Sequence, residues 1–167
     1  MPEAVSNSST LIHLAGIGHL GLLKEFYDRV LITPSVWREV VEEGKGRAGA
    51  EEVKECYKSG WIEVIAPGNE AMVRLLKREL HEGEAEALAL AIEQHPAVIL
   101  LDELEARRIA NVYELCKTGV IGILIKAKLE GKIVSLRREL DILRSEAGFW
   151  ISDEVYWQAL RAVTEDE

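Results

Sequence analysis

Acidic side chains stand at two positions of the sequence where a site for a divalent cation is expected. Asp102 and Glu103 directly follow the apolar run at residues 97–101, and Glu86 begins the part of residues 84–92 that is apolar all round. A carboxylate at the start of such a helix is costly to remove from water unless a partner offsets its charge. Mg²⁺ and Mn²⁺ prefer oxygen ligands, and they assist phosphodiester hydrolysis by polarising the phosphate and supplying a hydroxide nucleophile.

Each of these carboxylates also has an ordinary explanation. Glu86 could be an exposed residue of a first helical turn, where the helix dipole favours negative charge. Asp102 could be a helix N-cap. Helix periodicity places Glu84 about 200° away from Glu86, so these two cannot share one site, whereas Glu82 can share a face with Glu86.

The elements that must position these residues alternate along the chain, which predicts a single α/β domain over residues 1–167 with a mainly parallel sheet flanked by helices. Strands are expected at residues 4–5, 30–32, 61–65 and 97–101. Helices are expected near residues 10–15, 20–26, 34–41, 50–57, 71–80, 83–93, 103–115, 119–129, 135–144 and 152–163, with a loop at 44–49. Ligands of such sheets gather at the carboxyl ends of the strands. Asn7 follows the first strand, and Glu39 flanks the apolar face of its helix.

The net charge of the chain is −9, so any binding of nucleic acid depends on a local basic patch or on a metal ion that reverses the sign of the site. Arg107 and Arg108 come one turn after the last acidic position, and Lys126, Lys128 and Lys132 form a second basic cluster. Together they could hold phosphates beside a metal ion. For each residue alone, ordinary ion pairing on a helix surface is the simpler interpretation.

The remaining features indicate a cytoplasmic protein. No apolar run approaches the roughly 20 residues of a membrane span, and the N-terminus has no basic region of the kind that begins a signal peptide. Cys56 and Cys116 are expected to be free thiols of a reducing compartment. The histidines show no metal-ligand spacing and are expected at the surface or at helix ends: His13, His19, His81 and His95.

Six segments, in order, carry a resemblance to a known family. They are VSNSSTLIHLAGIG (5–18), VLITPSVWREV (30–40), LHEGEAEALALA (80–91), VILLDELEARRIA (98–110), TGVIGILIKAKLEG (118–131) and GFWISDEVYWQAL (148–160). The set resembles the PIN-domain superfamily, and within it the stand-alone prokaryotic branch akin to VapC toxins. The resemblance implies a PIN-like three-layer sandwich and an endoribonuclease that depends on Mg²⁺ or Mn²⁺.

The resemblance also assigns roles by position. The catalytic positions fall on Asn7, Glu39, Glu86, Asp102 and Glu103, and all but Asn7 would hold the metal ion. The alignment does not decide between Asp102 and Glu103. The residues expected to contact RNA are Ser8, Arg107, Arg108, Thr118 and Lys126.

One departure from the family pattern concerns activity. Family nucleases generally have Asp where this chain has Asn7, which offers a carbonyl oxygen but no charge. Two hypotheses follow: an active ribonuclease, or a catalytically weakened PIN-like module that binds RNA or a protein partner without cleaving. The resemblance further implies a homodimer and, for a toxin, a small antitoxin partner. The apolar segment around Trp150 and Trp157 could serve an interface or close the core.

Overall fold

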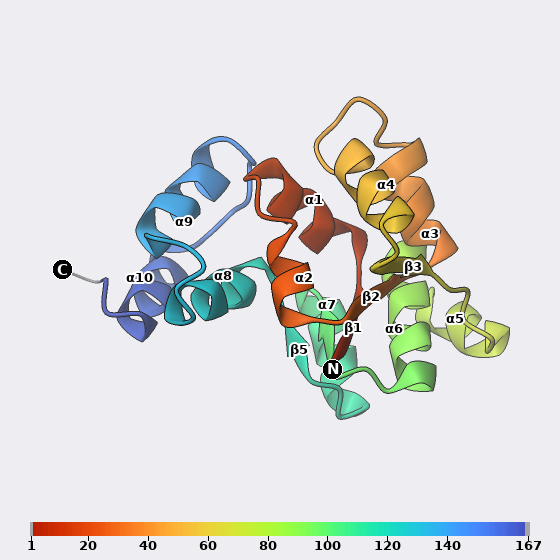
Figure 1. The fold of residues 1–167 in the computed structure, drawn as a ribbon. Coiled ribbons are helices and arrows are strands. Elements are labelled where there is room, and N and C mark those ends of the chain that lie inside the picture. The colour runs from red at the N-terminus through yellow and green to blue at the C-terminus, as the bar shows by residue number, and fades with distance from the viewer. Residues whose placement is uncertain (1, 166–167) are drawn as a thin grey trace.

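The computed structural model describes residues 2–165 and shows a parallel β-sheet with helices against its faces (Figure 1). Within these residues the sheet has five strands, in the order β3-β2-β1-β4-β5. In chain order the strands are β1 (Glu3–Ser6), β2 (Arg29–Ile32), β3 (Ile62–Val64), β4 (Val98–Leu100) and β5 (Lys117–Thr118). Their pairings are parallel, which confirms the predicted α/β fold.

The helices surround this sheet and extend beyond it. They are α1 (Ser8–Gly16), α2 (Leu22–Phe26), α3 (Pro34–Trp37), η1 (Arg38–Glu42), α4 (Ala50–Lys58), α5 (Glu70–Leu76), α6 (Glu82–Gln94), α7 (Leu104–Val112), α8 (Val120–Leu129), α9 (Leu136–Ser145) and α10 (Asp153–Ala162). Between residues 2 and 165, none of them combines the length and the apolar character needed to cross a membrane. Cys56 and Cys116 are free thiols, as predicted.

The central strand β1 determines where a site can form. Val5 lies opposite Leu31 of β2 on one side and opposite Ile99 of β4 on the other. The chain runs outward from β1 to β2 and β3, then returns to the other side of β1 with β4, so the strand order reverses between β1 and β4. Asn7 N donates a hydrogen bond to Leu100 O at 3.2 Å. The residues that follow β1 and β4 are therefore neighbours at the carboxyl edge of the sheet, where ligands of such folds bind.

The segment after β2 begins with a strong helix start and continues as a wider turn. Thr33 Oγ1 accepts a hydrogen bond from Val36 N at 3.3 Å, and Pro34 occupies the first helical position of α3, where its fixed φ suits a helix. α3 then passes into η1, a π-helical turn in which Glu43 N donates to Arg38 O at 2.7 Å. Such turns are uncommon and are found frequently at functional sites.

Two hydrophobic cores cover the two faces of the sheet. Successive strand residues point to opposite faces, so Ala4 packs in one core and Val5 in the other. The first core includes buried residues of α1, α2 and α8, and the second includes those of α6 and α7. The domain therefore has the helix–sheet–helix layers of the predicted PIN-like sandwich.

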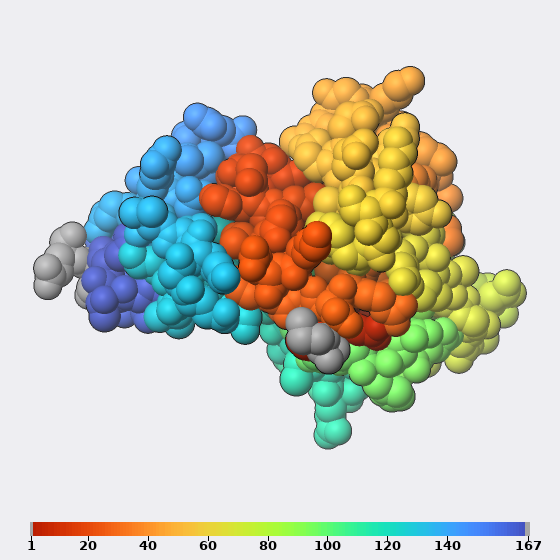
Figure 2. All heavy atoms as spheres, in the orientation of Figure 1, coloured from red at the N-terminus to blue at the C-terminus, as the bar shows by residue number. Residues whose placement is uncertain are grey.

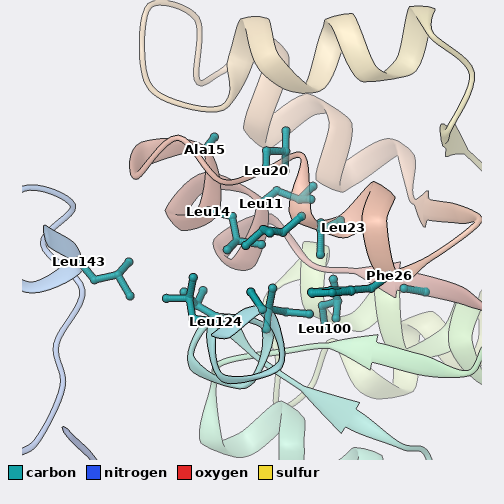
Figure 3. Close-up of a cluster of buried hydrophobic side chains, with 14 of the residues drawn as sticks. Leu11, Leu14, Ala15, Leu20, Leu23, Phe26, Leu100, Leu124 and Leu143 are labelled. Atoms are coloured by element: carbon teal, nitrogen blue, oxygen red, sulfur yellow. The ribbon is translucent and has the colours of Figure 1, made fainter. Parts of the chain in front are cut away.

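The three C-terminal helices α8, α9 and α10 extend the first core beside the sheet (Figure 1). The space-filling view in Figure 2 shows these blue helices against the red and orange surface of α1 and α2. Inside, Leu11 and Leu14 of α1 lie close to Leu124 of α8, and Leu143 of α9 points towards them from the left (Figure 3). The C-terminal helices are thus joined to α1, the helix that carries the first residues of the site.

Leu124→Ala is expected to lower the free energy of unfolding by about 2–5 kcal/mol, because truncation of a fully buried leucine leaves a cavity. Leu124 is 0% exposed, whereas Leu129 on the same helix is 66% exposed. Leu129→Ala is therefore the matched control, with an expected change within about 0.5 kcal/mol. Urea unfolding followed by circular dichroism measures both changes. Equal losses for the two variants would contradict the packing of α8 against α1.

Candidate functional site

A cleft of about 230 Å³ opens at the carboxyl edge of the sheet, beside the start of α1. Four parts of the chain contribute to it: α1 with the residue before it, η1, the start of α6, and the residue before α7. The residues that line it are Asn7, Ser8, Ser9, Ile12, His13, Glu39, His81, Glu84 and Glu103. Of the residues proposed from the sequence, it brings Asn7, Ser8, Glu39 and Glu103 together, and it adds Glu84.

Asn7 forms the floor of the cleft and is only 1% exposed. Its side-chain Oδ1 accepts a hydrogen bond from Thr10 N at 3.1 Å, which makes it the N-cap of α1. An N-cap oxygen satisfies one of the free N–H groups at a helix start. Asn7 therefore has a structural task as well as its place in the cleft, and an aspartate could perform the same task.

Glu39 projects from the π-helical turn η1 towards the start of α6 and is half-buried. A Cβ atom at Gly83 would collide with Glu39 Oε1, so the glycine leaves the space that this carboxylate occupies. Gly44 matters in a similar way at the end of η1, because a Cβ there would collide with the carbonyl oxygen of Val40. Gly83 thus leaves room for the Glu39 carboxylate, and Gly44 permits the tight backbone at the end of η1.

Glu84 is the most deeply buried carboxylate of the cleft, with 4% of its surface exposed. Its Oε1 lies 3.2 Å from His81 Nε2, while its Oε2 has no hydrogen-bond partner among the described residues. Burial raises the pKa of the Glu84 carboxyl; His81 opposes this, and the negative charges of Glu103 and Glu39 raise that pKa further. The Glu84 carboxyl therefore lies in negative surroundings that His81 offsets only in part.

Asp102 and Glu103 have different surroundings although they are adjacent in sequence. Asp102 Oδ2 accepts a hydrogen bond from Thr10 Oγ1 at 2.9 Å, and its Oδ1 accepts one from Val120 N at 3.1 Å. A Cβ at Gly119 would collide with Asp102 Oδ1, so that glycine permits the close approach. Glu103 is exposed and lines the cleft. Of the two candidates, Glu103 is thus the one that faces the site.

Glu86 is turned towards the start of α3 rather than towards the cleft. Its Oε1 accepts a hydrogen bond from Ser35 N at 3.2 Å, and Glu82 accepts one from Ser35 Oγ at 2.8 Å. These two glutamates share a face of α6, as periodicity predicted, but Glu84 occupies the place in the site that was assigned to Glu86. A helix that is apolar all round does not reveal which face meets the sheet edge. Gly83, next to Glu84, is the sequence signal for close packing there, because it leaves room for the Glu39 side chain at the start of α6.

The model of the DUF3368 family, described as a PIN domain, matches residues 3–165. The chain belongs to this PIN domain family. No protein of curated function matches it. PIN domains form a superfamily of nuclease type, and they generally use divalent metal ions. The resemblance to the PIN superfamily that the six segments indicated is thereby confirmed over nearly the whole chain.

The cleft of this PIN domain fits a divalent ion by its donor atoms. Within residues 2–165, no three His, Cys, Asp or Glu side chains are grouped so as to hold a metal ion alone. Mg²⁺, however, usually binds through one or two carboxylates together with waters and substrate phosphates. Glu84 Oε2 and Ser8 Oγ are buried oxygens without a hydrogen-bond partner in the described chain, and Glu39 and Glu103 line the same cleft. This all-oxygen set is what such an ion prefers.

The residues expected to contact RNA fall into two groups, and the first group lies near the cleft. Ser8 lines the cleft itself. Arg107 and Thr118 line a neighbouring pocket of about 430 Å³, which we call the side pocket, together with Asp102. This group therefore lies in the cleft or in the pocket beside it.

The second group is engaged in surface contacts. Arg108 Nη2 pairs with Glu105 Oε2 at 2.7 Å. Lys126 Nζ pairs with Glu130 Oε2 at 3.2 Å and lies 5.1 Å from the centre of the Phe26 ring. Both side chains show the ordinary ion pairing of a helix surface that the sequence left open as an alternative.

Two histidines of the cleft carry no metal-ligand spacing in the sequence, and their positions depend on the fold. His13 Nδ1 donates to Ser9 O at 2.8 Å, and its ring meets the Phe149 ring edge-on with centroids 4.8 Å apart. His81 Nδ1 accepts a hydrogen bond from Glu84 N at 3.4 Å and caps α6. His81 does lie at a helix end, as predicted, but its place beside a buried carboxylate becomes visible only in the structure.

In metal-free protein, Glu84→Gln is expected to increase the free energy of unfolding near neutral pH, because it removes a buried charge. The folded-state pKa of Glu84 is raised above its ordinary 4.5, so the folded state binds more protons between the two values. The stability of the unchanged protein therefore falls as pH rises from about 4.5 through the folded pKa. The advantage of Glu84→Gln grows over the same range. Urea unfolding in EDTA at several pH values measures it, with Glu86→Gln as control. A Glu84→Gln protein that is less stable at every pH would refute this account.

Proposed function

We propose that this PIN domain is an endoribonuclease that hydrolyses RNA phosphodiester bonds with the help of Mg²⁺ or Mn²⁺. One observation carries the proposal: the buried, unpartnered oxygen of Glu84 lies in the same cleft as Glu39 and Glu103, at the edge of the sheet where ligands bind. A buried carboxylate near other acidic side chains weakens a fold unless a cation offsets its charge. Membership of a nuclease-type superfamily supports the choice of reaction.

Glu84 would hold the ion with the help of Glu39 or Glu103, water and the substrate phosphate, and Asn7 lines the same cleft. A divalent ion in this cleft supplies positive charge that offsets the charge of the phosphate and makes a water molecule easier to deprotonate. Ser8 Oγ, which is buried and has no hydrogen-bond partner in the described chain, is placed to donate to that phosphate or to the attacking water. Because the net charge of the chain is −9, this local positive charge would also reduce the repulsion between the cleft and the RNA phosphates.

The resemblance to VapC toxins extends the proposal to the setting of the reaction. It supports a cytoplasmic homodimer that an antitoxin protein controls. These features concern how the activity would be regulated, and the chemistry of the cleft does not depend on them.

Glu84→Gln is expected to lower Mn²⁺-stimulated RNA cleavage by about 100-fold or more, because the amide cannot supply the negative charge that holds the ion. Glu86→Gln is the matched control, two residues away on the same helix. Its Oε1 can still accept from Ser35 N, so cleavage should stay within about threefold of the unchanged protein. A fluorescent RNA substrate measures the rates, and circular dichroism checks the fold. Equal loss in both variants, or in neither, would rule out the assignment of Glu84.

A second candidate function is a weakened PIN module that binds RNA or a protein without cleaving. The observation that favours it is the neutral side chain of Asn7 on the floor of the cleft, where family nucleases generally have Asp. Glu39, Glu84 and Glu103 still line the cleft, and one or two carboxylates suffice for one ion under the proposal above.

Asn7→Asp distinguishes the two candidates. Asp can accept the same hydrogen bond from Thr10 N, so the fold should be retained while the cleft gains one charge. For an active nuclease we expect the Mn²⁺ concentration for half-maximal activity to fall, with less than about a tenfold change in maximal rate. Titration of the ion against the cleavage rate gives both quantities. Cleavage that appears only in the Asn7→Asp protein would instead favour the weakened module.

A further inference from the structure

The side pocket lies against the acidic cleft, and the two share a wall. Asp102 lines the side pocket, while Glu103, the next residue, lines the cleft. On the other side, His13 of the cleft touches Phe149 of the side pocket, ring edge to ring face, with centroids 4.8 Å apart. A chain whose phosphate lies in the cleft would therefore bring its next chemical group to the side pocket.

Trp150 stands at the side pocket with most of its indole in solvent, at 81% exposure. The backbone on both sides of it is tied down: Phe149 N donates to Leu143 O at 3.0 Å, and Arg144 Nη2 donates to Ile151 O at 2.8 Å. The indole is thus presented by an anchored loop between α9 and α10, and its burial contributes little to the core. An anchored, exposed aromatic ring is a platform on which a nucleobase can stack.

The wall of the side pocket also offers polar groups. Arg107 Nη1 donates to Leu101 O at 3.1 Å, which holds the guanidinium in place. Within residues 2–165 it forms no ion pair with a carboxylate, in contrast to Arg108. Thr118 adds a hydroxyl group on the same wall. A fixed guanidinium can donate hydrogen bonds to a base edge or to a phosphate oxygen. It would therefore add polar contacts to the stacking surface of Trp150 in the same pocket.

We propose that the side pocket binds an unpaired nucleobase, stacked on Trp150 and held by Arg107, of the same strand whose phosphate occupies the acidic cleft. This inference rests on the nuclease function proposed above and narrows its substrate to a single-stranded segment. A base inside a duplex is stacked on its neighbours and cannot enter such a pocket without leaving the helix. Stacking also explains how a chain with a net charge of −9 could hold RNA, since it needs no broad basic surface.

The test is a binding measurement in EDTA, where cleavage cannot occur. A short fluorescein-labelled oligouridylate is titrated with the full chain, and fluorescence anisotropy gives Kd. Trp150→Ala is expected to raise Kd about tenfold, and Trp150→Phe, which keeps an aromatic face, should stay within about threefold of the unchanged protein. Trp157→Ala is the matched control, because Trp157 is also partly exposed but lies over Arg137, 5.3 Å from its guanidinium carbon. It should leave Kd unchanged.

Several outcomes would overturn the inference. They are unchanged binding by Trp150→Ala, equal weakening by Trp157→Ala, and binding of a duplex of mixed sequence as tight as that of its separate strand. Cleavage is measured separately, so the two proposals can fail independently. Trp150-dependent binding without any metal-stimulated cleavage would retain the base pocket and refute the nuclease. Trp150-dependent binding of a DNA strand alone would retain the pocket and refute RNA as the substrate.

Discussion

The whole site depends on the carboxylate of Asp102, which joins three elements. Its two oxygens accept hydrogen bonds from Thr10 of α1 and from the first residue of α8, while its own backbone lies just after β4. Hydrogen bonds to a charged acceptor are stronger than those between neutral groups. Asn7 and Ser8 at the start of α1 line the cleft. Asp102 therefore helps to position them, although it does not line the cleft itself. Glu103, the next residue, lines the cleft.

The cleft works against the stability of the fold that carries it. Glu84 is buried near two other carboxylates, and the described chain supplies one histidine as its partner. Perturbed groups of this kind are typical of functional sites, where the arrangement serves a ligand rather than the empty protein. The two hydrophobic cores supply the stability that tolerates it. The surroundings of Glu39 show the same pattern. Gly83 has no side chain and leaves room for the Glu39 carboxylate, and Glu39 itself lies on a π-helical turn rather than a regular α-helix.

The sequence predicted much of the fold and part of the site. Buried parallel strands such as β4 appear as unbroken apolar runs, and Thr33 with Pro34 marks a helix start, so these elements follow from local patterns. β5 has only two residues and is defined by its pairing with β4. The choice of Glu84 over Glu86 depends on how α6 is rotated against the sheet, which tertiary packing decides. The same holds for Asp102 and Glu103, whose directions depend on the backbone after β4.

His81 has one further consequence for the cleft. Its Nδ1 accepts the amide hydrogen of Glu84, so the ring proton must be on Nε2, which faces the carboxylate of the same residue. The hydrogen bond from Glu84 N to His81 Nδ1 thus selects one tautomer, and the imidazole contacts both the backbone and the side chain of Glu84. One ring therefore contacts the first turn of α6 and its acidic side chain together. The Glu84 carboxylate is thus oriented before any ligand enters the cleft.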